Sequence, residues 1–386
     1  MQADKPSTIA AAVLVSVIGG FPIFTLPIIG PVLQEQLGFT IQQAGQVAPV
    51  EVLGVGLASV LAIFWIRRVN WRIAALIAVA AVVIGNVLTT FQSDPTVLTV
   101  IRFLTGFIGE GTAFALGLSI IADTKETDRN FAYVIAAQVA FGVVTLLTLF
   151  RFSAAFGSIG GIYIPLAAFA VLVLLMLKFI PEGGAKVVPE AQTAQAPSMA
   201  IPMVGLAVLL IWCTGLGAVW AFMASIGMAG GLESTSAGDA LAISSTVAIL
   251  GALAASVMAD KFGRLAPVSI ALIVQMIMLS VLTGDMTFAR FAATAAVFQI
   301  FWNLTGPYLM ATIASSDASG RAAVLIPAAQ TGGFFLGPYI AAQLVTEENL
   351  FPANIVGIAG CLIALVIFVP LIMQINKAAG ARAASQ

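Results

Sequence analysis

The chain of 386 residues is far more apolar than a water-soluble protein, with 60% hydrophobic and 9% charged residues. Soluble domains contain roughly 45–50% apolar and about 25% charged residues. The mean hydropathy of +1.08 points the same way. These values exclude a water-soluble core and indicate an all-α membrane protein that crosses the bilayer many times.

Charge and residue usage exclude several classes of function. The net charge of −1 at pH 7 offers no basic surface for nucleic acid. Histidine is absent, which removes imidazole metal ligands and histidine bases. The two cysteines, Cys213 and Cys361, fall in apolar segments, where we expect buried thiols rather than a disulfide or a metal pair. We therefore expect no metal site, no cofactor and no nucleic-acid partner.

The spacing of the charges predicts twelve membrane helices. A bilayer core about 30 Å thick needs roughly 20 apolar residues. Segments of that length without Asp, Glu, Lys or Arg number ten: 6–34, 73–93, 130–150, 152–177, 191–232, 240–259, 265–284, 291–316, 322–346 and 349–376. Two further apolar segments carry charge, since 44–66 contains Glu51 and 95–121 contains Arg102 and Glu110. The first segment is too long for the apolar part of a signal peptide, so we expect it to be retained.

The basic residues predict the orientation of the chain, because Lys and Arg concentrate in cytoplasmic loops. With a cytoplasmic N-terminus, thirteen of the sixteen basic residues fall on the cytoplasmic side: Lys5, Arg67, Arg68, Arg72, Lys125, Arg129, Lys178, Lys186, Lys261, Arg264, Arg321, Lys377 and Arg382. The opposite face collects acidic residues, among them Glu35, Asp94 and Asp285. An even number of spans then places both the N- and the C-terminus in the cytoplasm.

A stretch rich in Pro, Gly, Ala and Gln divides the predicted helices into two groups of six. We interpret residues 181–199 as a cytoplasmic linker between an N-terminal bundle, 1–180, and a C-terminal bundle, 200–386. A shift of 192 residues, which aligns loop arginines of the two halves, also places Gln138 on Gln330. These matches indicate two pseudo-symmetric bundles.

The segment 95–121 is unusual because it carries two charges inside a membrane span. Arg102 lies about two turns from its first end, and Glu110 lies near its middle. An ionised group at the bilayer centre costs at least about 2.5–3.5 kcal/mol, so such residues usually line a pathway or a binding site. Glycines at positions 106, 109 and 111 are expected to leave room beside Glu110 for a neighbouring helix or a solute.

Glu51 and Arg102 lie at a similar depth, each about seven residues from the outer end of its helix. Equal depth predicts an ion pair, which lowers the free-energy cost of burying either group. Glu110 is then expected to have no partner. Because burial favours the neutral form of a carboxyl, Glu110 could bind and release a proton as water access alternates. The alternative is a permanently neutral carboxyl that only hydrogen-bonds a solute or a helix.

One loop sequence resembles a known family. After the eighth predicted helix stands the sequence Asp260-Lys261-Phe262-Gly263-Arg264. It resembles the loop signature of the major facilitator superfamily, usually an Asp, a basic residue, any residue, a Gly and a basic residue. The resemblance implies a gating loop in which Asp260 and Arg264 clamp helix ends and Gly263 permits a tight turn. The first half keeps basic residues, including Arg72, but lacks the Asp and the Gly.

A second resemblance lies in the fourth predicted helix, whose sequence is Arg102-Phe103-Leu104-Thr105-Gly106-Phe107-Ile108-Gly109. It looks like the Arg-x-x-x-Gly-x-x-Gly pattern of the same superfamily. The resemblance implies that Arg102 belongs to a proton-coupling machinery, together with Glu51 and Glu110. The alternative is an arginine that merely reaches to the outer membrane interface.

Other polar and aromatic residues at comparable depth are candidates for binding a solute: Gln138, Gln299, Asn303, Gln330, Trp302 and Phe24. They would suit a cavity with mostly apolar walls and a few directed polar groups. Each of them could equally be a contact between helices.

Together with the predicted spans and matched halves, the resemblance implies a monomeric secondary transporter of the cell inner (plasma) membrane. It would move a small organic, amphipathic solute by alternating access, with the proton gradient as energy source. An efflux pump for drug-like compounds and a lysolipid flippase of the same fold are alternatives. An enzyme is not expected, because the chain lacks both histidine and a Gly-x-Ser-x-Gly sequence.

Overall fold

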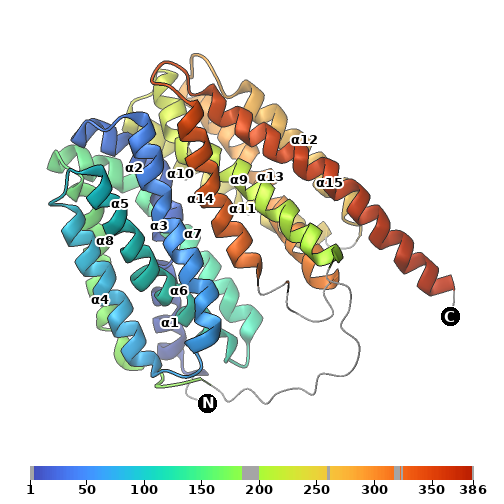
Figure 1. Ribbon diagram of the computed structural model, residues 1–386, viewed down its shortest axis with the longest axis horizontal. Helices are drawn as coiled ribbons and strands as arrows, with labels where there is room; N and C mark the ends of the chain where they lie inside the picture. Colours follow the sequence, from blue (N-terminus) through green and yellow to red (C-terminus); the bar gives the residue numbers. More distant parts are fainter. Residues whose placement is uncertain (1–3, 185–199, 259–260, 317–321, 323–324, 385–386) are drawn as a thin grey trace. The chain divides into compact units, whose positions relative to one another are not determined.

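The computed structural model describes residues 4–184, 200–258, 261–316, 322 and 325–384, and within these ranges the chain is built from helices (Figure 1). The only β-type pairing in these ranges is an isolated bridge between Thr346 and Asn349. The predicted all-helical class is therefore confirmed for the part of the chain that the structure describes.

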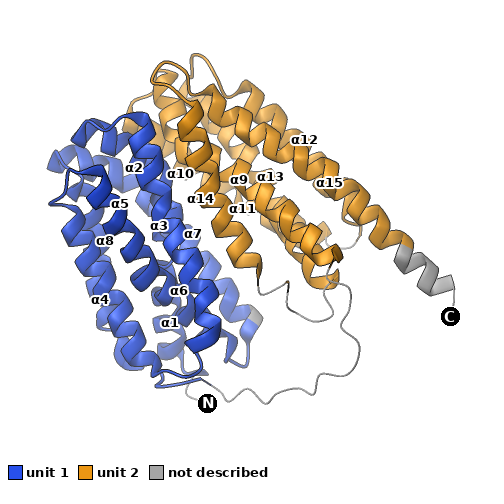
Figure 2. Ribbon diagram, in the orientation of Figure 1, with its two compact units in different colours: residues 1–191 blue, residues 192–386 orange. Residues whose placement is uncertain are grey.

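The chain divides into two compact units, residues 1–191 and 192–386 (Figure 2). The helices of the first unit are α1 (Pro6–Ile18), α2 (Phe21–Leu37), α3 (Ile41–Trp65), α4 (Trp71–Thr89), α5 (Pro95–Leu104), the π-helix η2 (Thr105–Glu110), α6 (Gly111–Ala122), α7 (Thr127–Phe156), α8 (Gly160–Leu174) and the short 3₁₀ helix η3 (Leu177–Phe179). Most of the linker predicted at 181–199 lies outside the described residues.

The second unit contains seven helices within the described ranges: α9 (Ala200–Ala229), α10 (Ser234–Val247), α11 (Ile249–Met258), α12 (Leu265–Val281), α13 (Phe288–Ser316), α14 (Ile326–Leu344) and α15 (Phe351–Ala384). Helix α9 is the most buried of them, and it packs on α13, α14 and α15.

Nine helical stretches in the described ranges are long and apolar enough to cross a bilayer: Pro6–Leu37, Ile41–Trp65, Trp71–Thr89, Pro95–Ala122, Arg129–Phe156, Gly160–Phe179, Ala200–Ala229, Ser234–Met258 and Phe351–Lys377. Helix α12 is also apolar but shorter, and α13 and α14 fall outside this group. The chain is thus a multi-pass membrane protein, while the number of twelve spans stays a prediction.

The surface of the first unit fits contact with lipid. On α4, four large aliphatic side chains are each more than half exposed: Ile73, Leu76, Ile77 and Ile84. The opposite side of the same helix buries Ala75, Ala78, Val79 and Val82. In water such an apolar stripe would favour aggregation, whereas acyl chains solvate it well.

The turns follow local sequence signals. Thr40 begins α3 with a capping box, because its hydroxyl accepts from the Gln43 N–H while the Gln43 side chain accepts from the Thr40 N–H. Asp94 begins α5 by accepting from the N–H groups of Thr96 and Val97. Gly263 has a φ of +62°, a left-handed conformation that favours glycine. The tight turn expected at Gly263 is therefore confirmed.

Glycines let the helices of the second unit pack at backbone distance. A Cβ atom on Gly337 of α14 would overlap the Thr214 carbonyl oxygen of α9. By contrast, a Cβ atom on Gly332 of the same helix would meet only a Leu210 methyl group, at 3.4 Å. The α9–α14 contact therefore depends on some glycines of α14 and not on others.

We expect Gly337→Ala to destabilise the protein by about 1–3 kcal/mol, because two helix backbones would have to separate. Gly332→Ala is the matched control and should leave stability nearly unchanged. Thermal unfolding midpoints of the two purified variants in the same detergent provide the comparison. Equal midpoints for both variants would contradict the packing described for α9 and α14.

Candidate functional site

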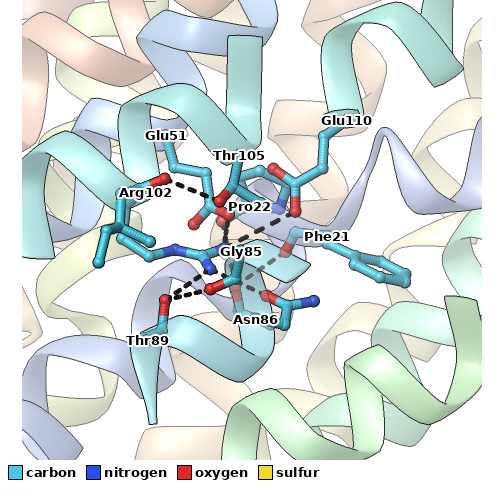
Figure 3. A network of polar contacts seen from close by, with 11 residues as sticks. Phe21, Pro22, Glu51, Gly85, Asn86, Thr89, Arg102, Thr105 and Glu110 are labelled. Carbon is cyan, nitrogen blue, oxygen red and sulfur yellow. Dashed lines mark hydrogen bonds and ion pairs between the residues drawn. The ribbon is translucent and has the colours of Figure 1, made fainter. Parts of the chain in front are cut away.

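The guanidinium of Arg102 is the centre of a buried polar network in the first unit (Figure 3). Its Nη2 forms an ion pair with Glu51 of α3. Its Nη1 donates to Asn86 Oδ1 at 2.8 Å and to Thr89 Oγ1 at 3.2 Å, both on α4. The ion pair predicted between Glu51 and Arg102 is therefore confirmed.

The face of the same guanidinium lies over an aromatic ring. The Cζ atom of Arg102 is 4.5 Å from the ring centroid of Tyr163 on α8, a distance suited to a cation–π interaction. Only 2% of the Arg102 surface is exposed. With partners on three other helices and so little exposure, Arg102 is not a side chain that reaches out to the membrane interface.

Glu110 is fully buried beside the same arginine, with its Oε1 3.8 Å from Arg102 Nη2. The expectation that Glu110 has no partner is wrong, because the long Arg102 side chain reaches both carboxyls. Among the described residues, however, neither carboxyl oxygen of Glu110 has a hydrogen bond. Two carboxyls thus share one guanidinium, and only one of them, Glu51, is held in close contact.

The backbone at Glu110 is a π-helix, η2, between two α-helical segments. Single π-turns occur often at functional sites, and they shift the residues that follow around the helix axis. Gly106 and Gly111 allow the turn to lie against α3, since a Cβ on Gly106 would overlap the Glu51 carbonyl oxygen and one on Gly111 would lie 2.6 Å from Ala58 Cβ. The predicted close approach of a neighbouring helix at these glycines is confirmed.

In the first unit, the solute-site candidates Gln138 and Phe24 make contacts between helices. Gln138 Nε2 donates to the carbonyl oxygen of Ser16 at 3.1 Å, which joins α7 to α1. The ring of Phe24 lies 6.4 Å from that of Phe141 and also covers Gly142. Neither residue takes part in the Arg102 network.

In the second unit, α13 brings Gln299, Trp302 and Asn303 together. Gln299 Nε2 donates to Ser244 Oγ at 2.6 Å, and its Oε1 accepts from Ser245 Oγ at 3.0 Å. Asn303 Nδ2 donates to the Gln299 carbonyl oxygen at 3.0 Å. The amide of Gln299 is thus committed to α10, whereas Trp302 and Asn303 are half-buried.

Trp302 belongs to an aromatic cluster. Its ring centroid lies 5.8 Å from that of Trp220, 5.6 Å from that of Phe334 and 6.2 Å from that of Phe298. Gln330, the remaining candidate, lies on α14 and is half-buried. The cluster offers flat apolar surfaces next to the half-buried amide of Asn303.

The gating-loop candidates lie at helix ends. Arg264 Nη1 donates to Ser315 Oγ at 2.6 Å and to the Ala311 carbonyl oxygen at 3.2 Å, which ties the loop to α13. Asp260 lies outside the described residues. In the first unit, Arg72 Nε donates to the Ile180 carbonyl oxygen at 3.1 Å.

In the first unit, the loop after α3 forms an ion pair with a carboxylate from another part of the chain. Arg67 Nη1 contacts both oxygens of Asp123, at 2.9 and 2.7 Å, and this pair joins the end of α3 to the end of α6. The loop itself lacks an Asp, so the sequence comparison of the two loops missed this ion pair.

Several buried polar residues were not among the predicted site residues. Arg102 is surrounded by Asn86, Thr89 and Tyr163. A second buried polar network is centred on Gln275 of α12, which accepts from Trp212 Nε1 and donates to Thr305 Oγ1, both at 3.1 Å. Asn86 and Gln275 each stand as an amide in an otherwise largely apolar stretch of helix. That isolation is a sequence signal; Tyr163 has none.

No group of three or more acidic or cysteine side chains within the described ranges is placed to hold a metal ion. No protein-family model matches the sequence, and no curated protein matches it.

Solved structures do match the fold. The nucleoside transporter NupG is 13% identical with a TM-score of 0.70, over 94% of this chain and 99% of that one. A bacterial homolog of the human lysosomal transporter Spinster is 14% identical with a TM-score of 0.67, over 95% and 96%. A D-xylose-proton symporter is 16% identical with a TM-score of 0.75, over 94% and 96%. The chain therefore shares its fold with these three transporters.

The ion-pair geometry predicts an order of stability among variants. Arg102→Gln should be the most damaging change, about 3–5 kcal/mol, because it leaves two buried carboxyls without a cation. Glu51→Gln should cost less, since Glu110 remains within reach of Arg102. The double variant Glu51→Gln/Arg102→Gln should be more stable than Arg102→Gln alone.

Unfolding midpoints in detergent test this order, with Arg68→Gln as the control for losing an exposed arginine of the same unit. A double variant less stable than both single variants would contradict the pairing.

Proposed function

We propose that this protein is a proton-coupled secondary transporter, with Glu110 as the residue that binds and releases the coupling proton. The single observation that carries the proposal is the buried Glu110 carboxyl, which shares Arg102 with Glu51 and has no hydrogen bond among the described residues. The fold agrees with this function, since it is shared with transporters that include a D-xylose-proton symporter.

The charge balance of the network supports proton binding. With both carboxyls ionised, Glu51, Glu110 and Arg102 would carry one uncompensated negative charge in a site excluded from water. Burying an unpaired charge is expensive, so one carboxyl is expected to hold a proton. Glu110 is that carboxyl, because Glu51 is in direct contact with Arg102. A conformational change that admits water to Glu110 would stabilise its charged form and release the proton.

The proposed solute is small, organic and amphipathic. In the second unit, the ring of Trp302 would contact its apolar part and the amides of Asn303 and Gln330 would bind its polar groups. In the first unit, Phe24 and Gln138 are the corresponding candidates. Gln299 would hold the geometry of α13 through Ser244 and Ser245. Transport assays should include sugars, nucleosides, drug-like cations and lysolipids, because efflux of drug-like compounds and lysolipid transfer are the functions from which this proposal must be distinguished.

We also propose that the chain forms a monomer with twelve spans in two six-helix bundles, 1–180 and 200–386, with both termini in the cytoplasm. Alternating access would then follow from rocking of the bundles, with loops at Arg72 and Gly263–Arg264 joining helix ends on the cytoplasmic side.

Cysteine labelling tests this topology. Both native cysteines are buried, so they should contribute little background. Lys377→Cys should react with a membrane-impermeant maleimide only in inverted vesicles, whereas Glu348→Cys should react only in right-side-out vesicles. Labelling of both positions from the same side would contradict the proposed topology.

For the coupling role, we expect Glu110→Gln to reduce solute accumulation driven by a pH gradient at least tenfold, while solute counterflow continues. The amide keeps the size of the carboxyl but cannot exchange a proton. Proteoliposomes containing a pH-sensitive dye would report solute and proton movement together. Glu35→Gln, which changes an exposed carboxylate of the same unit, is the matched control. Proton uptake that persists with transport in Glu110→Gln would remove Glu110 as the coupling residue.

A further inference from the structure

Arg102 is held by two different kinds of contact. The donors in the plane of its guanidinium are directed at Asn86 and Thr89 through Nη1 and at the two carboxyls through Nη2. The face of the guanidinium, in contrast, is in contact with the Tyr163 ring. In-plane hydrogen bonds fix the direction in which the group points, and contact with a ring fixes the tilt of its plane.

Tyr163 is itself firmly placed. Its side chain is 1% exposed, and α8 packs on α4, the helix that carries Asn86. The start of α8 is pressed against the end of α7, since a Cβ on Gly161 would overlap the backbone at Phe152 and Ser153. The ring can therefore act as a fixed wall against which the guanidinium lies.

The position of the guanidinium decides how strongly it acts on each carboxyl. Its Nη2 is in contact with Glu51 but 3.8 Å from Glu110 Oε1, so a tilt of the guanidinium plane changes its distance to Glu110. The titratable and charged groups that face it are Glu51 from α3, Glu110 from η2 and Tyr163 from α8; α4 contributes the uncharged Asn86 and Thr89.

We propose that Tyr163 is a positioning residue: its ring keeps the guanidinium of Arg102 on Glu51 and prevents it from moving fully onto Glu110. The inference rests on the proposed role of Glu110 as the proton site. Without the ring, Arg102 is free to approach Glu110 and stabilise its ionised form. A more acidic solution is then needed to protonate Glu110, and the transport rate should shift along the pH axis.

Two kinds of substitution test the role of the ring. Tyr163→Phe keeps the ring face and should retain the wild-type pH profile of solute uptake in proteoliposomes. Tyr163→Leu removes the ring and should shift the half-maximal pH by about 0.5–1 unit toward acid, the size expected for loss of one cation–π contact. Solute counterflow, which needs no net proton movement, should change less than twofold in both variants.

Because Tyr163→Leu also opens space in a packed site, a second set of variants keeps the shape of the ring. Replacing Tyr163 with phenylalanine and then with increasingly fluorinated phenylalanines weakens the electrostatic attraction of the ring face at nearly constant volume. The half-maximal pH should move toward acid in step with fluorination. Phe169→Leu is the control on the same helix, because the Phe169 ring lies 4.9 Å from the Phe141 ring, at an angle of 53°. This variant should leave the pH profile unchanged.

The outcomes separate the two proposals. If Glu110→Gln abolishes coupling but the fluorinated series and Tyr163→Leu keep the wild-type pH profile, the positioning role is wrong and the proton site stands. If Glu110→Gln still couples solute to proton movement, the proposed function fails whatever Tyr163 does. Equal acid shifts in Tyr163→Phe and Tyr163→Leu would also overturn the positioning role, because they would show that the hydroxyl, and not the ring, matters.

Discussion

One buried guanidinium shared by two carboxyls is the constraint on which the first unit depends. Arg102 cannot be desolvated alone, so helices α3, α4 and α8 each supply a partner: Glu51, the Asn86–Thr89 pair and Tyr163. These contacts fix how four helices are rotated about their axes. They also leave Glu110 farther from the same cation, with its Oε1 3.8 Å from Arg102 Nη2.

The backbone around this network is shaped to permit it. Regular α-helix would place Arg102 and Glu110 about 12 Å apart along the axis and on different faces. The π-turn at Thr105–Glu110 changes which face carries Glu110, and glycines at the turn let α3 lie against it. The π-turn and the glycine contacts therefore act together: both are needed to bring a second carboxyl close to an arginine that already has one.

The sequence allowed part of this site to be predicted. Depth along two helices was enough to pair Glu51 with Arg102, because membrane thickness places residues at equal distance from a helix end at a similar level. The partner of Glu110 was missed because a π-turn has no residue pattern that distinguishes it from an α-helix. Tyr163 was missed because an aromatic residue in an apolar span reads as ordinary packing. The all-helical class followed from composition, whereas the contacts of Gln299 and Gln275 depend on helix rotation, which hydropathy does not encode.

The two units differ in the charged residues at matching positions. Aligning the two halves of the sequence with the predicted shift of 192 residues makes this difference visible. The 192-residue shift places Glu51 on Ile243, Arg102 on Thr294 and Glu110 on Trp302. Every charged member of the network is thus matched by an uncharged residue in the second unit. Trp302 instead joins a cluster of aromatic rings. Among the described residues, the buried Arg102 lies in the first unit, and the position of the second unit matched to Glu110 carries an aromatic ring. Introducing a carboxyl at position 302 would not reproduce the first site, because position 294 carries a threonine and not an arginine that could share the charge.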